Sequence, residues 1–141
     1  LIRWPILYIF ANASHILSLA MLIGASALLD LRLLGGLARL PLAETAVTLS
    51  RVAALALGAT ILTGALIFSV RPLEYVENTA FLIKIGLVFL GTMNALAVRA
   101  SRPWAALIAG ASPTPALRLA ASASLAIWLA ALLAGRWIGF L

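Results

Sequence analysis

One histidine stands out among the side chains that could do chemistry in this sequence. His15 is the only histidine, and the chain has no cysteine. It lies in an apolar stretch, from Ile6 to Leu29, that contains no acidic and no other basic side chain. An imidazole in such a stretch serves either as an axial ligand to haem iron or as a buried hydrogen-bonding group. Both interpretations stay open from the sequence, and haem b is the cofactor that the first one implies.

Polar residues recur along the same stretch. On a helix, six side chains fall within about 60° of one direction: Tyr8, Asn12, His15, Ser18, Ser26 and Asp30. Because polar groups are costly in lipid, this stripe should face other helices or a partner. If His15 ligates haem, we expect Asn12 or Ser18 to position its ring. A second imidazole would have to come from another chain, and Met21 and Met93 are the alternative ligands within this one.

A second group of candidates consists of charged residues near the ends of apolar stretches: Asp30, Arg32, Glu74, Glu77, Lys84 and Arg136. We expect either glutamate to form an ion pair with Lys84 or Arg136, because charges near lipid are stabilised by pairing. Asp30 should cap its helix or pair with Arg32 or Arg99. A structural role is favoured for these charges, and a proton entry or an anion site is the alternative.

The elements that carry these residues follow from composition. The chain has 141 residues, of which 65% are hydrophobic and 10% charged. A typical soluble domain carries about 25% charged residues, so the sequence indicates an integral membrane protein. Continuous apolar runs predict an all-α fold, a single membrane domain over 1–141 built as an antiparallel four-transmembrane-helix bundle. The spans are expected at about 6–29, 52–70, 79–98 and 117–141, with an interfacial segment at 104–111 that Trp104 anchors.

The basic residues predict an orientation. Six arginines lie in the first and third connections: Arg32, Arg39, Arg51, Arg99, Arg102 and Arg118. By the positive-inside rule these two connections are cytoplasmic, and both termini and the 71–78 turn lie outside. The net charge of +6 is scattered rather than clustered, so we expect the lipid bilayer, and no nucleic acid, to be the partner of these charges.

Small residues recur at four-residue spacing in all four spans. The sets are Ala20 and Gly24, Thr60 and Gly64, Gly91 and Ala95, and Ala131, Gly135 and Gly139. In membranes such positions let helix backbones approach closely. We therefore expect packing surfaces, and the last set could equally serve docking to a second protein.

Three strings resemble a known family. HILSLAMLIGASALLDLRLLG, RPLEYVENTAFLIKIGLVFLGTMNAL and AGRWIGFL are similar to a family of short bacterial four-span membrane proteins related to the copper-resistance protein CopD. The resemblance covers nearly the whole chain. It implies a multi-pass protein of the bacterial inner membrane, with periplasmic termini under the orientation above. It also implies that His15, Asp30, Arg32, Lys84 and Arg136 are positions of interest.

The pattern of reactive residues argues against a self-contained enzyme. There is no nucleophile paired with a base, no pair of carboxylates on one helix and no nucleotide-binding loop. The leading prediction is a non-catalytic accessory subunit of a larger redox or photosynthetic membrane assembly, or of a homo-oligomer. The first alternative is a b-type haem electron-transfer subunit that uses His15. A small copper or ion transport protein is less favoured, because one histidine and two separated methionines form no copper-binding cluster and no metal ligand is predicted.

Overall fold

The structure, a computed structural model, describes residues 3–140 and is entirely helical where it has regular structure. Its four long helices are α1 (Pro5–Leu33), α2 (Leu42–Phe68), α4 (Thr79–Arg99) and α6 (Pro115–Trp137). Three short elements connect or end them: α3 (Pro72–Glu77), α5 (Arg102–Ile108) and the 3-10 helix η1 (Ile138–Phe140). Leu141, the last residue of the predicted fourth span, lies outside the described residues.

Each long helix is able to cross a bilayer. Their most apolar segments have mean hydropathies of 1.8 to 1.9. Even α4, with 21 residues, is about 32 Å long, which matches a hydrocarbon core of about 30 Å. The all-α, multi-pass membrane fold predicted from the sequence is therefore confirmed.

Helix boundaries follow local capping. The side chains of Asn78, Ser101 and Thr114 accept hydrogen bonds from backbone N–H groups in the first turns of α4, α5 and α6. Proline occupies an early position in α1, α3, α5 and α6, where its missing N–H costs nothing. After α1 ends, Gly35 adopts a φ of +103°, a conformation that suits glycine.

The structure changes two predicted boundaries. Helix α2 begins at Leu42, ten residues before the predicted span at 52. The 71–78 turn contains the short helix α3 rather than a simple tight turn. Both additions are helical backbone with charged residues, which a search for uninterrupted apolar runs does not detect.

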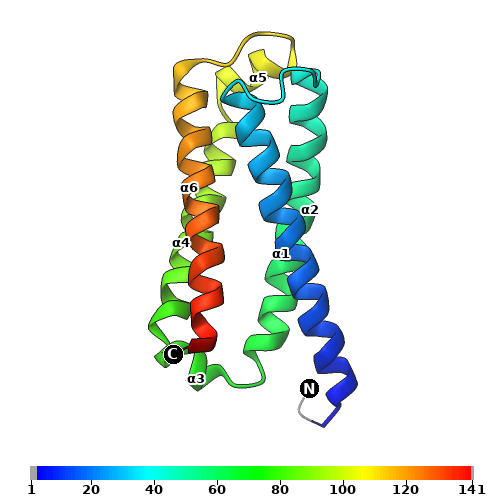
Figure 1. Cartoon of the computed structure of the whole chain (residues 1–141), viewed down its shortest axis with the longest axis vertical. Coiled ribbons are helices and arrows are strands. Elements are labelled where there is room, and N and C mark those ends of the chain that lie inside the picture. The colour runs from blue at the N-terminus through cyan, green and yellow to red at the C-terminus, as the bar shows by residue number, and fades with distance from the viewer. Residues whose placement is uncertain (1–2, 141) are drawn as a thin grey trace.

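The helices are antiparallel along the chain. Figure 1 shows both ends of the chain and α3 at one end of the bundle, and α5 with the α1–α2 connection at the other. Helix α1 packs against α2 and α6, and α6 packs against α4, whereas α2 and α4 have no extensive contact. The bundle is therefore a curved row in the order α2, α1, α6, α4, and it is open on the side between α2 and α4.

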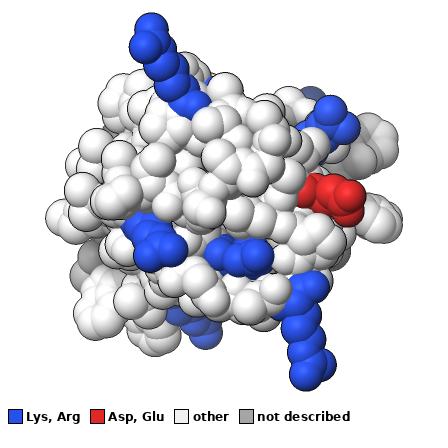
Figure 2. Space-filling view, turned by 90° about the horizontal axis from the view of Figure 1, so that it is seen from above, with Lys and Arg blue, Asp and Glu red and all other residues white. Residues whose placement is uncertain are grey.

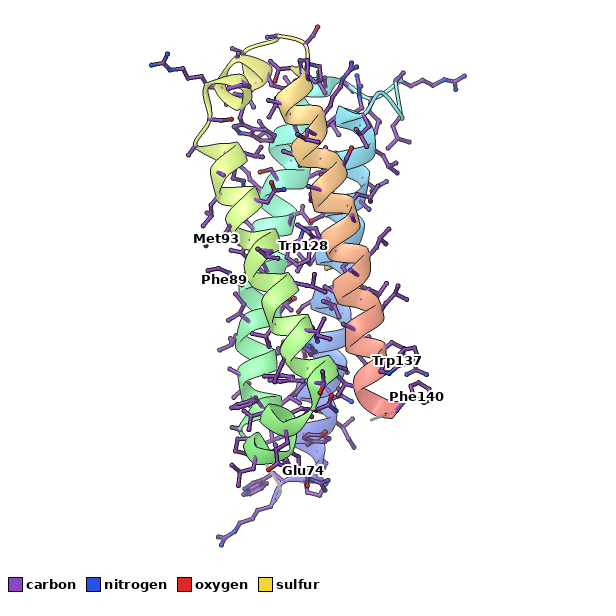
Figure 3. All side chains as sticks on the ribbon, turned by 90° about the vertical axis from the view of Figure 1, so that its left-hand side faces the viewer. Glu74, Phe89, Met93, Trp128, Trp137 and Phe140 are labelled. Carbon is purple, nitrogen blue, oxygen red and sulfur yellow. The ribbon has the colours of Figure 1, made fainter. Side chains whose placement is uncertain are left out.

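Two buried clusters hold the row together. One lies beneath α5 and consists of Leu33, Ala46, Trp104, Leu107, Leu117 and Ala121. The other, at mid-length, consists of Leu22, Ala56, Trp128 and Ala131. Figure 3 shows Trp128 inside the bundle, whereas Phe89 and Met93 project away from α4.

Trp104 differs from its prediction. Its side chain is only 8% exposed and packs in the cluster beneath α5, so it does not serve as an exposed interfacial anchor. The reason is that α5 contacts both α2 and α6, which places the apolar side of this short helix against the bundle.

The end that carries α5 is the more basic one. Figure 2 looks onto this end and shows basic side chains spread over it, with much less acidic surface. Of the six arginines on which the predicted orientation rests, only Arg39 lies between helices. The other five lie within the helices, toward this end, and Glu44 is in the first turn of α2.

Candidate functional site

His15 is held by a residue from the neighbouring helix. Its Nδ1 lies 2.9 Å from the hydroxyl oxygen of Thr63 on α2. That hydroxyl donates its own proton to the carbonyl of Ala59, at 2.7 Å. With that proton directed to the Ala59 carbonyl, the Thr63 oxygen accepts a hydrogen bond from Nδ1–H, and this tautomer leaves Nε2 with a lone pair. The ring is half-buried and lies against Gly64, whose Cα faces it.

The two residues predicted to position His15 do not do so. Asn12 is exposed. Ser18 is buried, but its hydroxyl donates to the carbonyl of Ser14 on its own helix, at 2.7 Å. The predicted stripe does turn inward at Ser26 and Asp30, which are both buried. Packing between α1 and α2, rather than proximity along α1, selects the partner of His15.

The charged group at the α3 end is more dispersed than predicted. Glu74 pairs with Arg71 at 3.5 Å on the surface. Among residues 3–140 no ion pair joins Glu74 or Glu77 to Lys84 or Arg136. The reason is that both glutamates are exposed on α3, beyond the start of α4, as the position of Glu74 in Figure 3 illustrates.

The two cations of this group have other neighbours. Lys84 is half-buried, and its aliphatic carbons lie alongside Gly135 of α6. The guanidinium carbon of Arg136 lies 5.8 Å from the centre of the Phe140 ring, within the range of a cation–π contact. Small residues on α6 and aromatic surface therefore accommodate these charges.

An aromatic cluster covers the α3 end. The rings of Phe68, Tyr75 and Phe81 lie 5.3 to 6.1 Å apart, centre to centre. Partial burial raises the pKa of Tyr75 above its ordinary value, and the nearby hydroxyl of Tyr8 raises this pKa as well, while Arg71 lowers it. This cluster closes the turn between α2 and α4 without supplying a reactive group.

Asp30 lies in a second polar location, at the α5 end. It is 5% exposed, and its Oδ2 has no hydrogen-bond partner among the described residues. It lines a cavity of about 170 Å³ between the helices. The other polar residues of that lining are Ser26, Ser50, Thr92, Asn94, Arg99 and Ser124.

The arginines expected near Asp30 are engaged elsewhere. Arg99 donates to the backbone carbonyl of Ser50 and so links α4 to α2. Arg32 donates to the carbonyl of Leu40, at 3.0 Å. Neither forms an ion pair with Asp30 in the described part of the chain, and Asp30 remains a buried acid beside a cavity.

Sequence reasoning did not identify three residues beside the polar groups of the bundle: Thr63 next to His15, Ser50 next to Arg99, and Ser124, which hydrogen-bonds to the side chain of Asp30. Thr63 had a weak signal, since it lies one turn after Thr60 and next to Gly64 in a membrane helix. Ser50 contributes its backbone carbonyl, a group that every residue type has and that sequence patterns therefore do not predict. Residues 3–140 contain no group of three or more His, Cys, Asp or Glu placed to hold a metal ion.

Fold and site together define a multi-pass, all-α membrane protein with isolated polar groups inside its bundle. Residues 4–141 match the family of unknown function DUF6644, and the chain belongs to this family. No curated protein and no solved structure shows significant similarity to it.

Proposed function

We propose that this protein is a non-catalytic membrane subunit that acts by packing against other transmembrane helices, either of its own copies or of a larger redox or photosynthetic assembly. Its polar groups supply individual hydrogen bonds rather than an arrangement for catalysis. The proposal therefore places function on the outer helix surfaces.

The supporting observation is a division among the helical glycines. A Cβ added to Gly64, Gly91 or Gly135 would meet a side chain of the neighbouring helix. A Cβ added to Gly24, Gly58 or Gly86 would meet nothing within 4 Å. Glycine costs a helix roughly 0.5 to 1 kcal/mol relative to alanine, and packing within this chain does not explain that cost at Gly24, Gly58 or Gly86.

Gly24 is the sharpest case. It is exposed on α1, one turn after the exposed Ala20, and the two form a small-residue pair of the kind that lets a second helix approach closely in a membrane. Leu17, Met21 and Leu28 surround the pair with exposed apolar side chains. We infer that this face of α1 contacts the partner helix.

The test is the mass of the protein extracted from its native membrane in mild detergent. We expect the wild-type chain to run well above its own 14.8 kDa and detergent shell, with partner chains or copies. Gly24→Leu should release it as a monomer, because a leucine side chain prevents close approach of the backbones.

The matched control is Ala126→Leu, which enlarges an exposed residue on α6. This variant should keep the wild-type mass. A wild-type protein that is monomeric and free of other chains would overturn the proposal, as would a Gly24→Leu variant with the wild-type mass.

The geometry of His15 favours one second candidate, a b-type haem subunit. A metal-ligating histidine commonly donates its other ring N–H to a fixed acceptor, and Thr63 takes that place here. The 170 Å³ cavity is too small for a haem, which would therefore lie between this chain and a partner that supplies the second ligand. A reduced-minus-oxidised absorption spectrum tests this candidate. It requires a haem band in the wild type that is lost in His15→Ala and retained in Asn12→Ala.

We further propose that the protein lies in the bacterial inner membrane with both termini in the periplasm, as the resemblance to CopD-related proteins and the basic α5 end suggest. Because the chain has no cysteine, single introduced cysteines report orientation directly. In intact spheroplasts a membrane-impermeant maleimide should label Glu77→Cys and leave Arg39→Cys unlabelled. The reverse pattern would invert the topology.

A further inference from the structure

The cavity beside Asp30 has the size of one small ring. Its volume is about 170 Å³. Cavities of about 150 Å³ in other proteins take up benzene, so this one accommodates a single six-membered ring. Trp104 and Trp128 line it from α5 and α6, and most of the remaining lining is aliphatic. The walls therefore suit an aromatic ring.

Asp30 favours a ligand that carries a hydrogen-bonding group. Its side chain is buried and its Oδ2 lacks a hydrogen-bond partner among residues 3–140. A buried polar atom without a partner is destabilising, so a ligand that bonds to it gains free energy that a purely apolar ligand does not. A hydroxyl group fits best, because it donates to a carboxylate and also accepts from a protonated carboxyl group.

The open side of the bundle gives the ligand an entrance. The α1 and α6 residues that line the cavity are mostly buried, whereas Ala54 of α2 and Ala95 and Leu96 of α4 are exposed. These exposed residues lie where α2 and α4 do not pack against each other. The entrance therefore faces the membrane interior, and Arg99 crosses from α4 to α2 at its α5 end.

We propose that this cavity binds a one-ring aromatic alcohol, with the hydroxyl bonded to Asp30 and the ring between Trp104 and Trp128. Free phenols and the head groups of membrane quinols share this chemistry. The inference is independent of the partner-binding function proposed above, since it concerns the inside of the bundle.

The experiment uses the four tryptophans as reporters. Trp104 and Trp128 line the cavity, while Trp4 and Trp137 are exposed in the α3 half of the protein. In the detergent-solubilised full chain with ¹⁵N-labelled tryptophan, the indole N–H signals are assigned with single Trp→Phe variants. We expect phenol to shift the Trp104 and Trp128 signals saturably and to leave the other two in place.

Toluene is the matched ligand without the hydroxyl. At equal concentration in the micelle, we expect phenol to bind roughly tenfold more tightly, because toluene leaves Oδ2 of Asp30 without a hydrogen-bond partner. Asp30→Ala should abolish this preference, whereas Glu77→Ala, at an exposed acid, should retain it. Ala54→Leu narrows the entrance and leaves Asp30 in place, so it should weaken binding of both ligands. This variant tests the site independently if Asp30→Ala does not fold.

Hydroquinone with and without a decyl chain distinguishes a site for free phenols from a site for membrane quinols. Saturable shifts of Trp104 and Trp128 by both molecules would identify a quinol head-group site with its tail leaving between α2 and α4. Shifts by hydroquinone alone would identify a site for free phenols. Equal binding of phenol and toluene, equal shifts of all four tryptophans, or no shift with phenol would each overturn the proposal.

Discussion

The two ends of this bundle are built differently. At the α5 end, a short helix folds over the long ones and buries Trp104 and Leu107, which are 8% and 0% exposed. At the α3 end, the first turns of α1 have few neighbours, and Trp4, Ile6 and Phe10 are all more than 60% exposed. The covered end therefore has interior volume in which a polar group can be isolated. The α3 end keeps Arg71, Glu74, Glu77 and Arg136 at the surface, whereas Lys84 is half-buried.

The comparison extends to the ionisable groups. Asp30 lies at the α5 end, and no described residue forms an ion pair with it. Glu74 pairs with Arg71 at the α3 end, at a position where both side chains are about two-thirds exposed. Surface pairs of this kind contribute little to stability. A buried acid with one unpartnered carboxylate oxygen is the more informative feature, because burying that oxygen costs free energy.

The largest expected effect separates the two ends directly. Trp104→Ala removes a buried indole and should lower the free energy of unfolding by about 3 to 5 kcal/mol. Trp137→Ala removes an indole that is 61% exposed and should change it by less than about 0.5 kcal/mol. Unfolding of both variants in the same mild detergent provides the measurement. Equal losses would mean that α5 is not a structural part of the bundle.

A smaller effect is expected where α4 meets α6. A Cβ at Gly91 would lie 2.7 Å from Cζ2 of Trp128, so Gly91→Ala forces the ring or the helix to move. Overpacking of this kind costs about 1 to 3 kcal/mol. Gly86→Ala on the same helix meets nothing and should be neutral or stabilising by up to about 1 kcal/mol. Thermal unfolding of the pair tests the contact, and a harmless Gly91→Ala would show that α6 is placed differently.

Next comes the single hydrogen bond between α1 and α2. Thr63→Val keeps the shape of the side chain and leaves Nδ1 of His15 without its acceptor, at a cost of about 1 kcal/mol. Thr48→Val, at an exposed position of α2, serves as the control. The ¹⁵N spectrum of His15 should show the Nδ1–H tautomer in the wild type and a mixture in Thr63→Val. An unchanged tautomer would place the proton elsewhere.

The smallest effect is expected at the exposed pair. Arg71→Ala should change stability at neutral pH by less than about 1 kcal/mol. It should also raise the pKa of Tyr75 further, because it removes the positive charge that favours the phenolate. The pKa of Tyr75 is already raised by folding, so its contribution to stability is fully present below about pH 10 and is lost as the pH rises through the folded-state value. Absorbance at alkaline pH measures the pKa of Tyr75, with Tyr75→Phe to identify the signal. A lower pKa of Tyr75 in Arg71→Ala than in the wild type would contradict the prediction.

Much of the fold was predictable because long uninterrupted apolar segments identify membrane-spanning helices. The boundaries of α4 were predicted within one residue. The first ten residues of α2 were missed, since Glu44, Thr45 and Ser50 interrupt the apolar run although the helix continues through them. Trp104 was misplaced because an apolar segment of seven or eight residues looks the same whether it lies on a membrane surface or over a protein core.

The site was less predictable, because its contacts join residues far apart in the sequence. Asn12 and Ser18 were chosen as neighbours of His15 along one helix, but its partner Thr63 lies 48 residues away. Asp30 was identified as a position of interest because placing an acid in an apolar helix costs free energy. Both the acid and its apolar neighbours can be read directly from the sequence. Its cavity depends on how far apart α2 and α4 stand, and no pattern in either helix specifies that distance.

The order of packing along the bundle has a consequence for how the protein is made. Helices α1 and α2 form one hairpin, α4 and α6 another, and the two meet mainly where α1 packs against α6. Each hairpin emerges from the ribosome complete, so the first can insert in the bilayer before the second is synthesised. The final step is then docking of two preformed halves, mainly through α1 and α6, with α5 packing against α2. Two separately expressed fragments, divided within α3, should therefore find each other in the membrane and rebuild the whole protein.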